Sequence, residues 1–179
     1  MNNHIQIYKN VIDPEYCDEL IHKFEKETWQ QEKVVHAGAD MTQVNLNESN
    51  WHDDVDKLVD ISVKYIMQYK KDCDLHDFQW PNEYAFEHFR MKRYLPNDKE
   101  EFRPHVDVNC LDNAARFMVF FLYLDDNEGG MTTFPLINKG SPCKGGSLLM
   151  FPPLWPWLHA GTKPIDKPKY IIGSYLHYV

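Results

Sequence analysis

The sequence predicts an α+β protein that is mainly β, with helices in its first part packed on an antiparallel β core. Two observations predict this class: apolar residues recur at helical spacing in the first part, and from Tyr84 onward short β-rich runs alternate with turn residues. Many short strands with such turns are typical of a sandwich or barrel. At 179 residues the chain fits one domain, residues 1–179, with helical support to about residue 80 and the β core from about residue 81.

Two helices are expected in the first part of the chain. The first begins at Asp13, a good N-cap, with Pro14 at the first helical position. Its apolar face follows the spacing i, i+3, i+4, i+7 and consists of Cys17, Leu20, Ile21 and Phe24. The second covers Asp53 to about Lys71, and its acidic first turn suits the N-terminal end of the helix dipole. Its apolar side consists of Val55, Leu58, Val59, Ser62, Ile66 and Tyr69.

The β region is expected to contain five short runs separated by turns. The runs are Tyr84–Tyr94, Arg116–Leu124, Thr132–Phe134, Ser147–Phe151 and Tyr170–Tyr178. The breaks carry turn-forming residues, at Pro96-Asn97-Asp98, Asp125–Gly130, Asn138-Lys139-Gly140 and Lys144-Gly145-Gly146.

The composition is that of a globular protein and argues against several partners. Hydrophobic residues make up 43% of the chain and charged residues 26%. The formal net charge of −8 at pH 7 disfavours binding to nucleic-acid phosphates. No apolar run approaches bilayer-spanning length, and Met1–His4 lacks the charged and apolar regions of a signal peptide. We therefore expect a cytoplasmic protein with no nucleic-acid and no membrane partner.

The cysteines indicate a reducing compartment. Cys17, Cys73, Cys110 and Cys143 contain no C-x-x-C pair, which argues against a zinc ribbon or a thioredoxin-type site. Free thiols are the simplest interpretation of this spacing.

Three residues could form a metal centre: His105, Asp107 and His159. Non-haem Fe(II) oxygenases hold iron by two imidazoles and one carboxylate on one face of the metal, which leaves the opposite positions open. On a strand, residues i and i+2 point to the same side, so His105 and Asp107 can converge on one ion. The third ligand must then come from a distant strand, as His159 could.

Two other segments resemble parts of this pattern. His52 and Asp54 have the same spacing, but they lie at a predicted helix start, where residues two apart do not face each other. His36-Ala37-Gly38 resembles His159-Ala160-Gly161, but it precedes the β region. We expect neither segment to bind the metal.

From about Tyr94 to Tyr178 the chain resembles the prolyl 4-hydroxylase branch of the Fe(II)/2-oxoglutarate oxygenases. The resemblance implies a double-stranded β-helix, also called a jelly-roll or cupin-like core, and iron ligation by His105, Asp107 and His159. The matching motifs follow in order along the chain: His105-x-Asp107, Arg116–Asp125, Glu128–Pro135, Lys144–Phe151 and His159-Ala160-Gly161.

The resemblance also implies a binding site for 2-oxoglutarate. Lys169 lies ten positions after His159, where the family places the basic residue that binds the far carboxylate of this cosubstrate. Such a dianion needs a cation at one end. Lys163 and Lys167 are nearby alternatives. The cosubstrate walls implied by the resemblance are Tyr94, Tyr123 and Thr132.

Three further residues match positions that face the substrate in this family. Arg116 resembles the arginine that contacts the peptide in prolyl hydroxylases, and Tyr175 and His177 resemble the family's Trp-x-His. One departure is Phe102, which stands where members often carry a tyrosine that positions the substrate. This difference leaves the substrate class open, while the iron site is unaffected.

These features predict a dioxygenase that uses Fe(II), 2-oxoglutarate and O2 to hydroxylate a C–H bond, with succinate and CO2 as coproducts and ascorbate as a further expected cofactor. The leading substrate is a prolyl residue in a peptide or protein. One alternative is a 2-oxoglutarate oxygenase that acts on a free amino acid or another side chain. A second is a non-catalytic jelly-roll binding module, and a third is a zinc hydrolase, since two histidines and a carboxylate also hold zinc.

Overall fold

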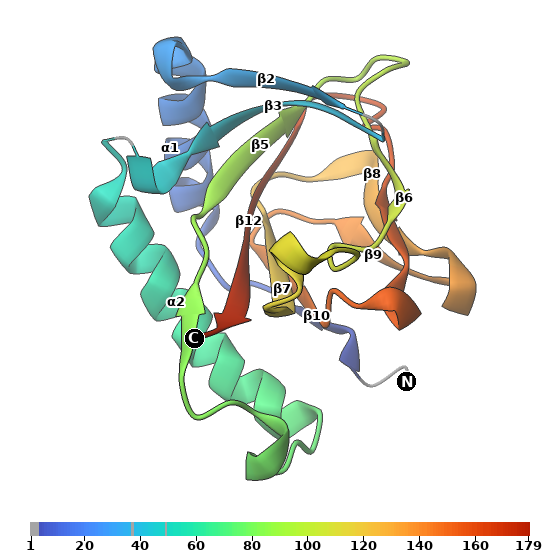
Figure 1. The fold of residues 1–179 in the computed structure, drawn as a ribbon. Helices are drawn as coiled ribbons and strands as arrows, with labels where there is room; N and C mark the ends of the chain where they lie inside the picture. Colours follow the sequence, from blue (N-terminus) through green and yellow to red (C-terminus); the bar gives the residue numbers. More distant parts are fainter. Residues whose placement is uncertain (1–3, 37, 49) are drawn as a thin grey trace.

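The computed structural model describes residues 4–36, 38–48 and 50–179 (Figure 1). Its α-helices are Pro14–Lys26 (α1) and His52–Asp72 (α2). Its strands are Gln6–Tyr8 (β1), Glu32–His36 (β2), Ala39–Asn45 (β3), Tyr84–Phe86 (β4), Arg90–Tyr94 (β5), Phe102–His105 (β6), Arg116–Tyr123 (β7), Asn127–Phe134 (β8), Lys139–Cys143 (β9), Ser147–Phe151 (β10), His159–Gly161 (β11) and Lys169–Tyr178 (β12). Short 3-10 helices cover Thr28–Gln30, Leu46–Glu48, Asp77–Gln79, Leu111–Asn113, Pro135–Ile137 and Trp155–Trp157.

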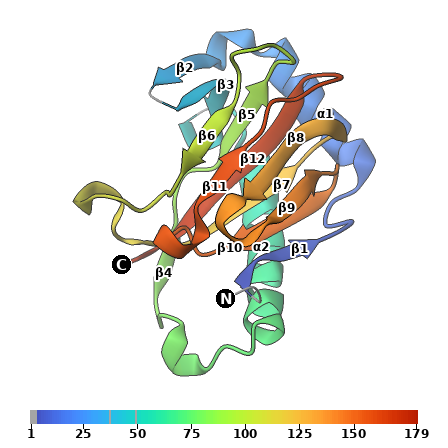
Figure 2. The ribbon, with the colours of Figure 1, turned by 90° about the vertical axis from the view of Figure 1, so that its right-hand side faces the viewer.

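The strands form one curled 12-stranded sheet in which the described pairings are antiparallel. Its order is β1-β10-β7-β12-β5-β3-β6-β11-β8-β9, with β2 added on β3 and β4 on β12. In Figures 1 and 2, β5, β7 and β12 lie between the two helices and the layer that contains β6, β8 and β11. An antiparallel sheet that nearly closes on itself fits the expected jelly-roll core.

Both predicted helices are confirmed. α1 begins at Pro14 behind the extended Asp13, and it buries Cys17, Leu20 and Phe24. α2 buries Leu58, Ser62, Ile66 and Tyr69. Full burial of a side chain such as Leu20 or Phe24 contributes about 1.5–3 kcal/mol, so these faces attach the helices firmly to the sheet.

The β region agrees with the prediction in type, but its described residues hold nine strands where five runs were expected, and β6, β9 and β11 lie outside those runs. Ser147–Phe151 is β10 as expected, whereas Tyr84–Tyr94 is split into β4 and β5. β8 begins at Asn127, ahead of the predicted Thr132, because Asn127 already pairs with Cys143 of β9; the register of this pairing shifts between Asn127 and Thr132.

The expected division at about residue 81 needs correction. β1, β2 and β3 come from the first part of the chain and join the sheet, so this part is not purely helical and packed helices make up less of the fold than predicted. Residues 1–3, on which the signal-peptide argument rests, and Ala37 of the His36 motif lie outside the described residues. Neither helix of the described chain has the length and apolar character needed to cross a membrane.

The central strands β7 and β12 are buried on both faces and separate two apolar cores. Alternate residues of a strand point to opposite faces. On β12, Ile172 and Leu176 face the helices, while Ile171 faces the interior of the curled sheet. The helix-side core joins apolar residues of both helices to those of the strands, whereas the interior core adjoins the candidate site.

Candidate metal centre

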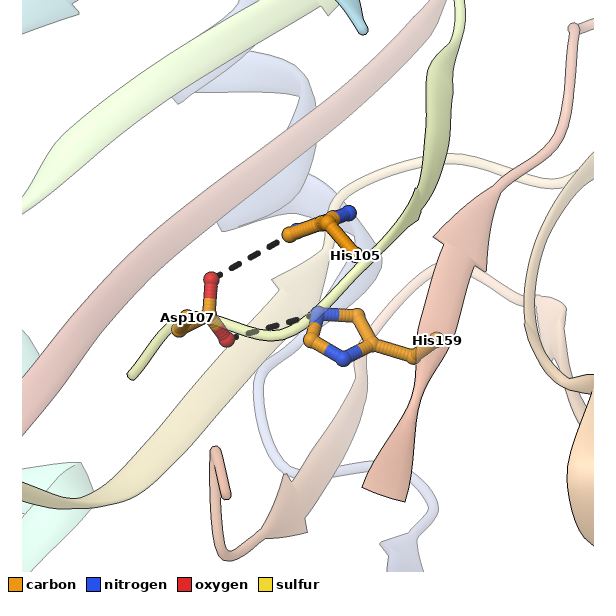
Figure 3. A group of neighbouring side chains, drawn as sticks. All are labelled: His105, Asp107 and His159. Atoms are coloured by element: carbon orange, nitrogen blue, oxygen red, sulfur yellow. Dashed lines mark ion pairs between the residues drawn. The ribbon is translucent and has the colours of Figure 1, made fainter. Parts of the chain in front are cut away.

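His105, Asp107 and His159 meet inside the curled sheet, as Figure 3 shows. His105 is the last residue of β6, and His159 is the first residue of β11. These strands are neighbours, and His159 is paired in register directly with His105. Asp107 lies beyond the end of β6 in a bend, so the predicted i, i+2 strand geometry is wrong in detail. The bend nevertheless turns the carboxylate toward both rings.

The three side chains are close enough to share one ion. One ligand atom from each lies within 4.8 Å of the others. His105 Nε2 is 3.5 Å from Asp107 Oδ1, and His159 Nε2 is 3.3 Å from Asp107 Oδ2. Asp107 is 8% exposed and His159 2%. In the described part of the chain, this is the group of histidine, cysteine and acidic residues suited to a metal.

The backbone fixes the orientation of both rings. His105 Nδ1 lies 2.7 Å from the carbonyl of Arg103, and His159 Nδ1 lies 3.0 Å from that of Trp157. A carbonyl only accepts hydrogen bonds, so each Nδ1 carries the proton and each Nε2 presents a lone pair. Both Nε2 atoms and Asp107 Oδ2 are buried without a hydrogen-bond partner in the described residues. Acceptors that converge in this way fit a shared cation.

The ionisation of the group agrees with metal binding. Burial lowers the pKa of His159 to about 4, so its ring is neutral at pH 7. Burial alone would raise the pKa of Asp107, but the neighbouring imidazoles and the Tyr175 hydroxyl hold it below its ordinary value. A neutral imidazole beside an ionised carboxylate is the protonation state that ligation requires.

Aromatic rings surround the histidines and limit access of water. Phe102 stacks on His105 with ring centroids 3.6 Å apart. Phe151 lies 4.8 Å from the His159 ring, and Phe134 lies 6.1 Å from it. The departure at Phe102 therefore places an apolar ring against the first histidine.

Lys169 projects into the same interior. It is 2% exposed, and its ammonium lies 5.0 Å from the centre of the Tyr94 ring. Burial lowers the pKa of Lys169 to about 8. Gly130 has φ +62°, and a Cβ there would lie 3.0 Å from Lys169 Cδ, so a glycine leaves room for the lysine stem. Lys163 and Lys167 are bound elsewhere, by the carbonyl of Asp98 and the carboxylate of Asp125.

A cavity of about 20 Å³ joins Lys169 to the histidines. Its lining includes Lys92, Tyr94, His105, Thr132, His159 and Lys169. A larger cavity of about 380 Å³ lies between the β2–β3 hairpin and residues 98–103, and it touches none of the three proposed ligands. The smaller cavity is therefore the one relevant to chemistry.

The other predicted cosubstrate residues also face this interior. Tyr123 donates a hydrogen bond at 2.7 Å to Oγ1 of Thr132, which lines the cavity, and the Tyr123 ring itself lies behind that wall, 6.0 Å from the Lys169 ammonium. The hydroxyl of Tyr94 contacts Met41 Sδ at 3.1 Å, so Tyr94 offers its ring face to Lys169. Their contact with a cosubstrate stays a prediction.

The predicted substrate residues form a cluster next to Asp107. Tyr175 donates a hydrogen bond to Asp107 Oδ1 at 2.8 Å. Arg116 stacks over the Tyr175 ring at 4.0 Å, and it binds both carboxylate oxygens of Glu87, at 2.6 and 2.8 Å. His177 lies 3.9 Å from the same carboxylate. Tyr175 thus orients a proposed ligand, and Glu87 compensates the charge of Arg116. Contact of these residues with a substrate stays a prediction.

Two residues of this interior were missed from the sequence, Glu87 and Lys92. Glu87 has no motif around it, and its role appears only when β4 and the strands beside it are assembled. Lys92 lies in Arg90-Met91-Lys92-Arg93. The apolar Met91 between Arg90 and Lys92 could have indicated a strand that places both cations on one face.

The histidines of the two rejected segments lie on other elements than the three proposed ligands, and that neither binds a metal stays a prediction. His52 begins α2, and His36 ends β2, where its ring packs 6.1 Å from Phe102. Neither histidine belongs to the metal-compatible group of the described residues.

No protein-family model and no curated protein sequence matches the chain. Solved structures do match. A viral collagen prolyl hydroxylase of Paramecium Bursaria Chlorella virus-1, in a 2OG complex, has a TM-score of 0.73 at 21% identity, over 98% of this chain and 96% of that one. A Trichoplax adhaerens prolyl hydroxylase, in complex with a hypoxia inducible factor peptide, has a TM-score of 0.69 at 14% identity, over 98% of this chain and 84% of that one.

A third match has a different reaction. The non-heme alpha ketoglutarate dependent epimerase of nogalamycin biosynthesis has a TM-score of 0.66 at 12% identity, over 97% of this chain and 77% of that one. The resemblance to these oxygenases that the motifs predicted is thus confirmed at the level of the fold. Because one fold supports more than one reaction, the chemistry must be argued from the site.

Proposed function

We propose that the protein is an Fe(II)- and 2-oxoglutarate-dependent dioxygenase that hydroxylates a prolyl residue in a peptide or protein. One observation carries this proposal: two imidazole Nε2 atoms and a carboxylate converge, with lone pairs facing one another, beside the buried ammonium of Lys169. This donor set is the 2-His-1-carboxylate facial arrangement of non-haem iron oxygenases.

The residues have distinct tasks in this proposal. His105, Asp107 and His159 would hold iron on one face, and the carbonyls of Arg103 and Trp157 keep the two rings aimed at it. When bound, Fe(II) and 2-oxoglutarate supply O2 activation and C–H oxidation, with succinate and CO2 as coproducts. Phe102 and the other rings around the histidines exclude water from this reaction.

Lys169 would bind the far carboxylate of 2-oxoglutarate. Its ammonium is buried and has no hydrogen bond or ion pair to a carboxylate within the described residues. A buried charge without a counter-ion is costly, and an incoming carboxylate would remove that cost. The cavity of about 20 Å³ has room only for a water-sized group, so lining side chains must move when a dicarboxylate enters. Lysine side chains have the freedom to do so.

A prolyl substrate is supported by the fold. The matched structures include a collagen prolyl hydroxylase and a prolyl hydroxylase with a bound peptide, and the chain resembles that branch in its motifs. The proposed test is mass spectrometry of proline-rich peptides incubated with the protein, iron, ascorbate and 2-oxoglutarate. We expect a mass gain of one oxygen on proline. Succinate formation without any modified proline would contradict the prolyl assignment and retain the oxygenase.

The second candidate is an oxygenase for a free amino acid or another small substrate, favoured by the structural match to an epimerase. A non-catalytic module would form no succinate under any condition. A zinc hydrolase would leave Lys169 without a role. Cytoplasmic location and use of ascorbate stay predictions.

A further inference from the structure

Two cations on β5, Arg90 and Lys92, face the interior of the curled sheet. Residues two apart on a strand share a face, and Tyr94 on this face belongs to the interior core. The intervening residues point the other way: Met91 is in the helix-side core, and Arg93 binds Glu25 of α1 at 2.7 Å. Lys92 lines the cavity that contains His105, His159 and Lys169.

The sheet register places Lys92 between Lys169 and the part of the interior that holds Asp107. On β12, Lys169 lies opposite Tyr94, Ile171 opposite Lys92, and Gly173 opposite Arg90. Farther along β12, Tyr175 reaches Asp107. Lys92 is therefore displaced from Lys169 by one pair of residues, about 7 Å along the strand, toward the metal centre.

Neither cation is in direct contact with a carboxylate of the described residues. Within residues 4–36, 38–48 and 50–179, the side chains of Arg90 and Lys92 make no hydrogen bond and no ion pair. Other cations near the interior are paired, since Arg116 binds Glu87 and Arg93 binds Glu25. Two like charges on adjacent positions of one strand face repel each other. An anion from outside the chain would relieve this repulsion.

The charged groups that face Lys92 still leave it without an anionic partner once iron and cosubstrate are bound. Burial lowers the pKa of Lys92 to about 8; Asp107 attracts Lys92, while Arg90, Arg116 and Lys169 repel it. In the function proposed above, Asp107 is a metal ligand and Lys169 neutralises one end of 2-oxoglutarate. The positive charge of Lys92 is then the one without an assigned partner among the described cavity residues.

On the basis of that proposed function, we propose that the substrate presents a carboxylate to Lys92, close to the carbon that is hydroxylated, with Arg90 as a second contact. The carboxylate can come from two sources: an acidic side chain next to the proline in a peptide, or the carboxylate of proline itself. A charge-assisted hydrogen bond of this kind gives about a tenfold to hundredfold preference for the anion.

The test compares matched neutral and anionic probes. One pair is a blocked proline-containing peptide with glutamate after proline, and the same peptide with glutamine there. The other pair is L-proline and L-prolinamide. Each is tested with the wild type, with K92M, which removes the charge, and with K92R, which keeps it. K99M, an exposed lysine of the loop after β5, is the matched control.

Two quantities are measured: the 2-oxoglutarate- and Fe(II)-dependent visible band without substrate, and kcat/KM for succinate formation with each probe. We expect the anionic member of one pair to be preferred at least about tenfold by the wild type, K92R and K99M. We expect K92M to lose this preference while keeping the band. The preferred pair identifies the source of the carboxylate.

Four results would overturn the proposal: equal use of both members by the wild type, a preference that survives in K92M, no turnover with either anionic probe, or a raised 2-oxoglutarate requirement in K92M. The last would show that Lys92 serves the cosubstrate. A wild type without the band would instead reject the oxygenase function itself, so the two failures are distinguishable.

Discussion

The two faces of β12 differ sharply, although their residues alternate along one strand. The face toward the helices carries Tyr170, Ile172 and Leu176, all in the helix-side core. The face toward the interior carries Lys169 at one end and Tyr175 near the other, beside Asp107. The first face gains stability from apolar burial, whereas the second buries polar groups at a cost.

This difference separates stability from chemistry within a single element. Removal of an apolar side chain from the helix side should weaken the fold and leave the proposed site intact in the folded protein. Removal of a polar side chain from the interior should abolish or weaken ligand binding with little loss of stability. The following predictions test that separation, in order of decreasing effect.

Asp107→Ala should lower the rate of succinate formation more than about a thousandfold, equivalent to about 4 kcal/mol, because it removes the only carboxylate of the proposed ligand set. The measurement is succinate release with a proline-rich peptide. Asp112→Ala is the matched control, since Asp112 is exposed and lies in the following 3-10 helix. Turnover retained in Asp107→Ala would remove this residue from the ligand set.

Leu176→Ala should lower the free energy of unfolding by about 3 kcal/mol, because Leu176 is 0% exposed in the helix-side core. Urea denaturation monitored by tryptophan fluorescence measures this quantity. Met67→Ala, at a side chain that is 63% exposed, should change it by less than about 0.5 kcal/mol. A similar small change in both variants would contradict the role of this core.

Lys169→Met should raise the 2-oxoglutarate concentration required for half-maximal activity by about a hundredfold, because the dianion loses its buried cation. Below about pH 8, the same change should raise the free energy of unfolding of the cofactor-free protein by about 3 kcal/mol, since burial lowers the pKa of Lys169 from 10.5 to about 8; this gain should vanish above about pH 10.5. Lys167→Met, a surface lysine paired with Asp125, is the control. An unchanged 2-oxoglutarate requirement would assign the far carboxylate to another residue.

Tyr175→Phe should weaken metal binding by about tenfold, because the hydroxyl that holds Asp107 Oδ1 at 2.8 Å is lost while the ring remains. Burial and the nearby Asp107 charge raise the pKa of Tyr175, so this hydroxyl stays protonated and donates at every usable pH. Anaerobic equilibrium dialysis of Fe(II) measures the effect. If metal affinity is unchanged and only substrate KM rises, Tyr175 belongs to the substrate site as the sequence predicted.

The 2-oxoglutarate requirement should rise about fourfold between about pH 7 and about pH 8.5, because the pKa of Lys169 in the free protein is about 8 and only the charged form binds the anion. The groups that face Lys169 are Tyr94, Tyr123, Cys143 and Lys92. Lys92 titrates in the same range. The pH dependence is therefore measured in the Lys92→Met variant, where only Lys169 of this pair titrates. A 2-oxoglutarate requirement that does not change with pH in this variant would contradict the role of Lys169.

The sequence could predict the local elements and the donor types. Helix α1 follows from Asp13, Pro14 and the apolar spacing behind them, and the metal-compatible group follows from His105, Asp107 and His159 together with the motifs around them that resemble a known family. These features are local or depend on residue type, so they do not require knowledge of strand pairing.

The missing information concerns contacts between distant strands. The register that sets His159 directly opposite His105 arises only when the sheet curls and β6 pairs with β11. Strands β1 to β3 are short or rich in polar residues, so the alternation of apolar and polar residues that predicts a strand is not evident in them. In the same way, Lys92 resembles a surface charge until its neighbours on β12 are known.

An anaerobic titration of the purified protein with Fe(II) and then 2-oxoglutarate tests the central claim most directly. If two imidazoles and Asp107 hold iron beside Lys169, a weak visible charge-transfer band should appear only when both are present, and it should saturate at one iron per chain. A folded wild-type protein that shows no such band, or a band of equal strength in Asp107→Ala, would contradict the proposed site.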